Sequence, residues 1–195
     1  MARTVSKEGT QKRKEQILKA AGNCFSAKGF HQSSMADICR EAGLSPGTVY
    51  HYFSSKDEMI VHFAKQELEQ ARQFVEAMQY VDSLTGLVDF TIHAILELDE
   101  QEEMQVYLEV LTESGRNKEV GKLLTKSDEI VLRALEKHLK RLGADKGETS
   151  FSSLALYVGI QIVALEIFKL EKPSAKERRD MSLLFRRGLL HVLGR

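Results

Sequence analysis

The residues with the clearest chemical potential form a short polar and aromatic cluster directly after Pro46. The cluster consists of Gly47, Thr48, Tyr50, His51 and Tyr52. Hydroxyl and imidazole groups can contact phosphate oxygens and base edges, and a glycine lets another backbone approach closely. Free N–H groups at the start of a helix also favour phosphate. The cluster therefore favours recognition of a nucleic acid.

Two short predicted helices joined by a tight turn would position this cluster. Ser33 and Ser34 are good N-cap residues for the first helix, and Gly43 ends it because glycine accepts positive φ. Ser45 caps the second helix, and Pro46 takes its first helical position. The positions spaced to form one small shared core are Ile38, Ala42, Leu44 and Val49. This pattern predicts a helix-turn-helix.

The same part of the chain resembles the N-terminal signature of TetR/AcrR-family transcriptional regulators. The matching motifs are GF at 29–30, SSM at 33–35, DI at 37–38, AGLS at 42–45, GTVYHYF at 47–53 and SKDEM at 55–59. The resemblance implies a homodimer that reads a palindromic operator on double-stranded DNA. It also implies a small-molecule effector that binds the larger domain and releases the DNA.

The resemblance also implies which residues contact DNA. The set is Ser33, Ser34, Pro46, Gly47, Thr48, Tyr50, His51, Tyr52 and Lys56. Ser33 and Ser34 would lie near phosphate, and Lys56 would clamp the DNA backbone. Pro46 departs from the Lys or Arg common at its position, which removes one possible contact with DNA.

The charge of the chain divides near residue 56. Lys plus Arg and Asp plus Glu both number 28, so the formal net charge is zero. Residues 1–56 hold 9 basic against 4 acidic side chains, and residues 57–195 hold 19 against 24. The positive part can meet phosphate, whereas the negative part cannot. We expect a DNA-binding domain over 1–56 and a ligand-binding and dimerisation domain over 57–195.

Apolar periodicity and the scarcity of proline predict an all-α fold of about nine helices. Beyond the helix-turn-helix, the expected helices cover 10–28, 55–80, 84–98, 102–112, 118–142, 152–170 and 174–192. Seven acidic residues and no basic residue lie between Glu97 and Glu113. We expect these acids to form a solvated face that keeps the domain at 57–195 away from DNA.

The apolar segment LALYVGIQIVALEIF at 154–168 must be covered on nearly all sides. Together with the last helix it predicts a dimer interface, for which the candidate residues are Leu184, Phe185, Gly188, Leu189 and Val192. The alternative is a buried central helix of a monomer. Fifteen residues are fewer than the roughly 20 needed to span a membrane. We therefore expect no membrane contact and a cytoplasmic protein, the more so because no secretory signal opens the sequence.

Candidate residues for an effector pocket lie on the helices expected within residues 57–195. They are Phe90, His93, Met104, Tyr107 and Glu166. Ordinary core packing is the alternative for each, and Glu166 could instead pair across a dimer interface or bind a cationic ligand. A mostly apolar cavity suggests a lipophilic or aromatic effector.

No pattern in the sequence indicates an enzyme, a metal site or a cofactor. GxSxG, HExxH, Walker and GxGxxG motifs are absent from the sequence, and the six histidines lack metal-ligand spacing. Cys24 and Cys39 read as buried packing thiols. The sequence thus predicts a ligand-responsive DNA-binding regulator, foremost a repressor. One alternative is a regulator that activates transcription or needs a co-ligand to bind DNA. The other is a helical small-molecule carrier or enzyme whose N-terminal domain no longer recognises DNA.

Overall fold

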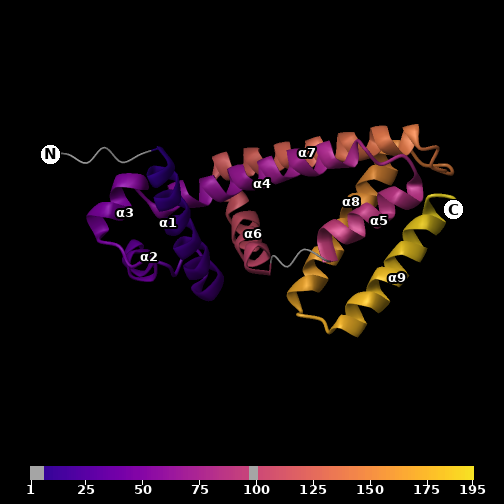
Figure 1. Cartoon of the computed structure of the whole chain (residues 1–195). Helices are drawn as coiled ribbons and strands as arrows, with labels where there is room; N and C mark the ends of the chain where they lie inside the picture. The colour runs from indigo at the N-terminus through magenta and orange to yellow at the C-terminus, as the bar shows by residue number, and fades with distance from the viewer. Residues whose placement is uncertain (1–6, 97–100) are drawn as a thin grey trace. The chain divides into compact units, whose positions relative to one another are not determined.

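The computed structural model describes residues 7–96 and 101–195, and every regular element in those ranges is an α-helix. The first four are α1 (Lys7–Lys28), α2 (Met35–Ala42), α3 (Pro46–Tyr52) and α4 (Lys56–Met78). The others are α5 (Leu84–Leu96), α6 (Gln101–Ser114), α7 (Lys118–Arg141), α8 (Phe151–Leu170) and α9 (Ala175–Val192) (Figure 1). Within these ranges the predicted all-α fold is confirmed.

Capping residues explain several of the helix boundaries. The Ser174 hydroxyl accepts the backbone N–H of Glu177, whose carboxylate accepts from Ser174 in return, so α9 begins with a capping box. At the start of α4, the two halves of a capping box are divided between Ser55 and Ser54. Ser55 accepts the Glu58 N–H, but the Glu58 carboxylate turns to the N–H and hydroxyl of Ser54. These two bonds hold the pKa of Glu58 below its ordinary value.

The described residues form two compact units. Unit 1 contains α1, α2, α3, α4 up to Gln66, and Glu102–Lys122. Its core has the fully buried side chains Ile17, Phe25, Ile38, Val49, Met59 and Ile60. This division into units does not test the boundary predicted after residue 56 between a DNA-binding and a ligand-binding domain. That boundary stays a prediction.

Unit 2 contains the rest of α4, α5, and Leu123–Arg195. In this unit α5 packs against both α8 and α9 (Figure 1). Its core includes Met78, Leu87, Leu135, Leu139, Leu165, Phe185 and Leu189. The Arg186 guanidinium pairs with the Asp89 carboxylate at 2.6 Å and thereby ties α9 to α5.

The length of α8 corrects one expectation from the sequence. The helix extends on both sides of the 15 apolar residues and has 20 residues, with a mean hydropathy of 1.8 over an 18-residue window, so by length and composition it could cross a membrane. Only 22% of its apolar window is buried within the chain. The exposed apolar side chains are Leu156, Tyr157, Ile160, Val163 and Ile167. Among the described residues, therefore, nothing covers one face of α8.

Candidate nucleic-acid interface

The helix α2 is fixed at both ends by local interactions. The Ser34 hydroxyl accepts the N–H of Asp37, and the Asp37 carboxylate accepts from Ser34 in return. The Ser34 hydroxyl bond and the Lys28 ammonium at 2.9 Å hold the pKa of Asp37 well below its usual range. Gly43 ends α2 with φ 64°, and its N–H donates to the carbonyls of Arg40 and Cys39. Ser34 and Gly43 are thus confirmed as caps of α2, whereas Ser33 is not its N-cap.

A small core sets the angle between α2 and α3. Ile38 and Val49 are fully buried, and Ala42 is nearly so. The Gln16 side chain of α1 donates to the Ala42 carbonyl at 2.8 Å, which satisfies an acceptor at the end of α2. Because these contacts use one face of α3, the other face is left for solvent.

The exposed face of α3 carries the predicted cluster. Ser45 caps the helix, and both Pro46 and Gly47 at its start are exposed. The Thr48 hydroxyl lies 2.9 Å from that of Ser45. A Cβ at Gly47 would meet no atom within 4 Å, so the space in front of Gly47 is open.

The three remaining side chains of the cluster continue along α3. Tyr50 is 52% exposed, which is unusual for so large an aromatic side chain. His51 is exposed, and its ring meets that of half-buried Tyr52 edge to face at 5.0 Å. The structure thus brings Pro46, Gly47, Thr48, Tyr50, His51 and Tyr52 onto one short helix, and we call these six residues the α3 surface.

Ser33 is buried, whereas the prediction places its side chain near phosphate. Its side chain is 3% exposed, and its hydroxyl is within hydrogen-bond distance of the Cys24 and Gly29 carbonyls, at 3.0 Å and 2.8 Å. Ser33 therefore holds the end of α1 against the next turn, and we remove it from the candidate set. Ser34 stays exposed beside it.

Lys56 is also engaged inside unit 1. Its ammonium donates to the carbonyls of Phe30, His31 and Ser33, and it lies 4.6 Å from the centroid of the Phe30 ring. A lysine has three N–H donors, and three carbonyls occupy them here. Lys56 therefore makes internal contacts here, with carbonyls that lie 23–26 positions earlier in the sequence, and the expected phosphate clamp stays a prediction.

The acidic segment of α6 is only partly a solvated face. The Glu113 carboxylate is buried and lies 2.7 Å from Nε2 of His31 and 3.2 Å from the Arg116 guanidinium. Glu109 accepts the backbone N–H of Phe30 at 2.8 Å. The expected solvation is wrong for Glu113, and its sequence neighbours gave no signal of these partners. The side chains at 97–103 lie outside the described residues.

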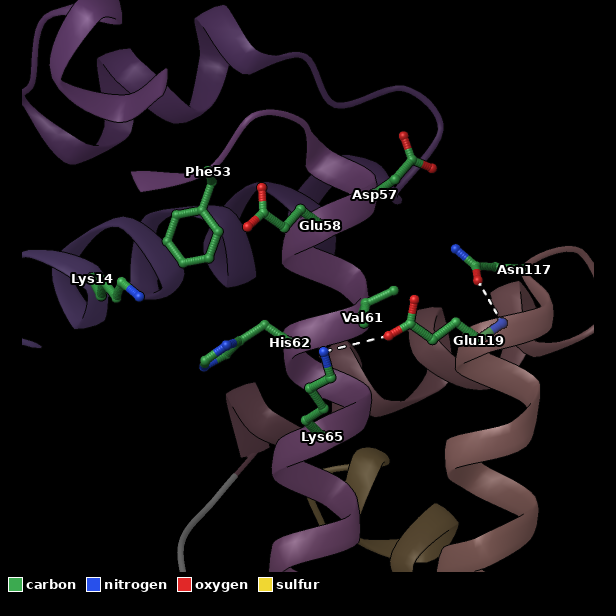
Figure 2. Close-up of a pocket in the computed structure, with 9 residues that line it drawn as sticks. All are labelled: Lys14, Phe53, Asp57, Glu58, Val61, His62, Lys65, Asn117 and Glu119. Atoms are coloured by element: carbon green, nitrogen blue, oxygen red, sulfur yellow. Dashed lines mark hydrogen bonds and ion pairs between the residues drawn. The ribbon is translucent and has the colours of Figure 1, made fainter. Parts of the chain in front are cut away.

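A polar pocket of about 390 Å³ lies in unit 1. Figure 2 shows its lining residues: Lys14, Phe53, Asp57, Glu58, Val61, His62, Lys65, Asn117 and Glu119. Burial, followed by the charges of Lys14 and Lys65, lowers the pKa of His62. Lys65 pairs with Glu119 at 3.4 Å, and the Asn117 side chain accepts the N–H of Glu119 (Figure 2). With both signs of charge present, the pocket has no single chemical preference.

The residues expected to bind an effector belong to different units. Met104 and Tyr107 are half-buried in unit 1, whereas Phe90, His93 and Glu166 belong to unit 2. Phe90 packs against Phe74 with ring centroids 5.2 Å apart, and His93 is exposed. Burial raises the pKa of Glu166 to about 7, although Lys169 opposes the shift.

The residues expected at a dimer interface divide between the two sides of α9. Leu184, Gly188 and Val192 are exposed. Phe185 and Leu189 are buried in the core of unit 2, so they support the exposed side from beneath. Leu183, which no sequence pattern singles out, is exposed beside Leu184.

Sequence comparisons relate the chain to bacterial regulators. The family described as "Bacterial regulatory proteins, tetR family" matches residues 17–63. The HTH-type transcriptional regulator UidR of Escherichia coli (strain K12) is 31% identical over 146 residues, which cover 72% of this chain and 70% of UidR. The uncharacterized HTH-type transcriptional regulator YfiR of Bacillus subtilis (strain 168) is 30% identical over 151 residues, 76% of this chain and 73% of YfiR.

Solved structures share the fold over nearly the whole chain. Salmonella enterica GusR aligns over 99% of this chain and 100% of its own, with a TM-score of 0.74 and 24% identity. A regulator from Saccharomonospora viridis in complex with choline has a TM-score of 0.76 at 19% identity, covering 93% of this chain and 97% of its own. The SmeT–triclosan complex has a TM-score of 0.73 at 21% identity, covering 93% and 91%.

Proposed function

The chain belongs to the TetR family of bacterial regulatory proteins and is a helix-turn-helix transcriptional regulator, and we propose that it is a ligand-responsive repressor. In this proposal it holds an operator as a homodimer and releases it when a small molecule binds. The observation that carries the DNA-binding step is the α3 surface. There Tyr50 and His51 are exposed, whereas Val49 of the same helix is fully buried. Thr48 and Tyr52 are half-buried. We propose that the protein acts in the cytoplasm, by binding and not by catalysis.

The α3 surface and exposed Ser34 form the proposed contact with DNA. Thr48 and His51 can reach base edges in the major groove, and the Tyr50 and Tyr52 hydroxyls can donate to phosphate. The open space at Gly47 allows DNA to approach the start of α3 closely. A helix-turn-helix places its second helix in the major groove, which agrees with this assignment.

A second copy of this chain is the proposed cover for the uncovered face of α8. The exposed apolar side chains of α8, from Leu156 to Ile167, occur in the same unit as exposed Leu183, Leu184 and Val192 of α9. Two α8–α9 pairs would bury these side chains in a four-helix interface. Regulators of this family dimerise, and two-fold symmetry of the protein predicts an inverted-repeat operator.

The effector is proposed to bind in the body of the protein and to be mostly apolar. Relatives of the fold have been solved with ligands as different as triclosan and choline, so the fold by itself does not select one chemistry. In this chain half-buried Phe74 and Phe90 offer aromatic surface, and Glu166 offers a half-buried carboxyl group. We therefore propose a lipophilic or aromatic effector, whose cationic group, if it has one, meets Glu166.

Selection from a pool of random duplexes tests the DNA-binding step. The full-length protein should enrich one inverted repeat, with half-site centres separated by about one helical turn or a multiple of it. Protein with Thr48→Ala in the α3 surface should enrich that repeat less strongly. Recovery of duplexes without a common sequence would contradict the assignment of a sequence-specific regulator.

A ligand screen tests the effector step. Lipophilic and aromatic compounds that bind the folded protein should raise its thermal midpoint, by an amount that grows with concentration. Those acting as effectors should also weaken binding to the selected duplex. Compounds that stabilise the protein yet strengthen DNA binding would instead identify a co-ligand and overturn the proposed release.

A further inference from the structure

The turn between α1 and α2, residues 29–34, is tied by side chains from distant parts of the chain. From α4, the Lys56 ammonium donates to the carbonyls of Phe30 at 2.7 Å and of His31 and Ser33 at 3.1 Å each. These are the three donors that a lysine has. Lys56 therefore has no remaining N–H donor for a phosphate while the turn keeps this geometry.

The helix α6 holds the same turn through two carboxylates. Oε2 of Glu109 accepts the N–H of Phe30 at 2.8 Å. The Glu113 carboxylate, 5% exposed, lies 2.7 Å from Nε2 of His31. A buried carboxylate is costly unless it is paired, so the position of the turn and that of α6 stabilise each other. We call Lys56, Glu109 and Glu113 the turn clasp.

The position of the turn determines where α3 lies. Phe30 is 2% exposed and packs edge to face on Phe25, which anchors the turn in the core of unit 1. Ser34 at the end of the turn is the N-cap of α2, and α2 shares its small core with α3. A displacement of the turn would therefore be transmitted through α2 to the α3 surface.

We propose that Lys56, Glu109 and Glu113 are positioning residues for DNA binding, acting through the α1–α2 turn and not through contact with phosphate. This inference rests on the proposed function, since it concerns the affinity of the α3 surface for DNA. It gives two acidic side chains a supporting role in binding a polyanion. Simple electrostatics assigns them the opposite effect, because removing a negative charge near DNA should strengthen binding.

Glu109→Ala and Lys56→Met test the sign of these effects. Binding to the inverted repeat enriched from the random pool is measured by fluorescence anisotropy between 50 and about 200 mM salt. Over this range, affinity that depends on phosphate contacts falls steeply as salt rises. We expect both variants to bind at least fivefold more weakly than the parent protein. Glu119→Ala is the matched control, because Glu119 is an exposed acid of unit 1 that pairs with Lys65 and not with the turn. This control should bind as the parent does, or slightly more tightly.

Amide hydrogen exchange tests the turn clasp without DNA. In Glu109→Ala and Lys56→Met the Phe30 amide should exchange at least tenfold faster, while amides of α8 keep their rates. If Glu109→Ala bound DNA as well as the parent protein or better, the positioning role would be overturned. It would also be overturned if Lys56→Met lost about one unit of salt slope with unchanged Phe30 exchange, since that is the signature of a phosphate contact.

The two proposals fail in different ways. If the parent protein bound no duplex selectively, the proposed function would fail, and the exchange experiment would still report on the clasp. If the parent bound selectively and the clasp variants matched it, only the positioning role would fail. Should Lys56→Met not fold, Glu109→Ala carries the test alone, because it removes a single hydrogen bond to the backbone.

Discussion

At the scale of single residues, the proposed interface depends on hydroxyl and imidazole groups that have few partners within the chain. Tyr50 is the clearest case, because half of its surface is exposed although its neighbour Val49 is fully buried. We propose that its hydroxyl contacts DNA, because Tyr50 lies on the second helix of the helix-turn-helix.

Tyr50→Phe should weaken binding to the selected duplex by about tenfold, because a hydrogen bond to a charged phosphate contributes roughly 1.5–3 kcal/mol. The fold should be unaffected, since the hydroxyl is outside the core. Fluorescence anisotropy measures the change. Tyr80→Phe is the control, because Tyr80 is 80% exposed, follows α4 and belongs to unit 2. Equal losses in both variants would refute a specific role for Tyr50.

Glu166 predicts a pH dependence of stability. Its pKa is raised from an ordinary 4.5 to about 7 in the folded chain, so the folded state binds a proton that the unfolded state has released. The free energy of unfolding should therefore fall as the pH rises from about 4.5 to beyond 7. Glu166→Gln should remove this fall and stabilise the protein at pH 8 by about 1–2 kcal/mol. Urea denaturation at pH 5 and pH 8 measures both values, and a destabilised variant at pH 8 would contradict the burial of an unpaired carboxylate.

Single residues also show where sequence reasoning ends. The types at Ser34, Gly43 and Ser45 predict their local roles, because a cap acts on a residue three or four positions away. The roles of Ser33 and Lys56 depend on carbonyl groups supplied by a different part of the fold. Their partners are set by how the turn packs, and the sequence alone predicts phosphate contacts there.

At the scale of elements, the helix-turn-helix depends on two glycines with different functions. Gly43 has φ 64°, a conformation that side chains other than glycine rarely adopt. Gly47 is helical and open to solvent. Gly43 therefore serves the fold, and we propose that Gly47 allows DNA to approach closely.

Substitution by alanine should separate these functions. Gly43→Ala should lower the free energy of unfolding by about 1 kcal/mol, because an alanine is strained at positive φ. Gly47→Ala should leave stability unchanged or raise it by up to about 1 kcal/mol, since alanine favours the helix. It should nevertheless weaken DNA binding, because a methyl group fills the open space. Thermal denaturation and anisotropy report the two effects, and unimpaired DNA binding by Gly47→Ala would place the DNA elsewhere.

Helix positions were predictable from the sequence, whereas the surroundings of one helix were not. Apolar periodicity and caps act locally, so the order and approximate bounds of the helices follow from them. The acidic α6 reads as a solvated helix, yet Glu109 and Glu113 bind the α1–α2 turn. Their partners lie about 80 residues earlier, at a distance that no local pattern reports.

At the scale of the whole molecule, charge and apolar surface are distributed according to function. Residues 1–56 carry the basic excess, and the apolar face of α8 lies in the part with the acidic excess. A net charge of zero therefore conceals a basic part, which we propose meets DNA, and an acidic part, which we propose associates with a second copy.

Leu184→Asp should dissociate the proposed dimer, because it places a charge among the exposed apolar side chains of α8 and α9. Sedimentation velocity at micromolar concentration should show a monomer. Operator affinity should fall by at least about 100-fold, because the two DNA-binding domains then bind their half-sites separately. Leu111→Asp is the control, since Leu111 is similarly exposed but belongs to α6. A Leu184→Asp protein that remained dimeric would exclude this face as the interface.

The central claim, that the α3 surface reads a specific duplex, is tested most directly by one titration. The parent protein is titrated with the selected inverted repeat and with a scrambled duplex of the same length, at one stated salt concentration. We predict that it binds the inverted repeat at least about 1,000-fold more tightly, as sequence-specific regulators do. Equal affinity for the two duplexes would contradict the account.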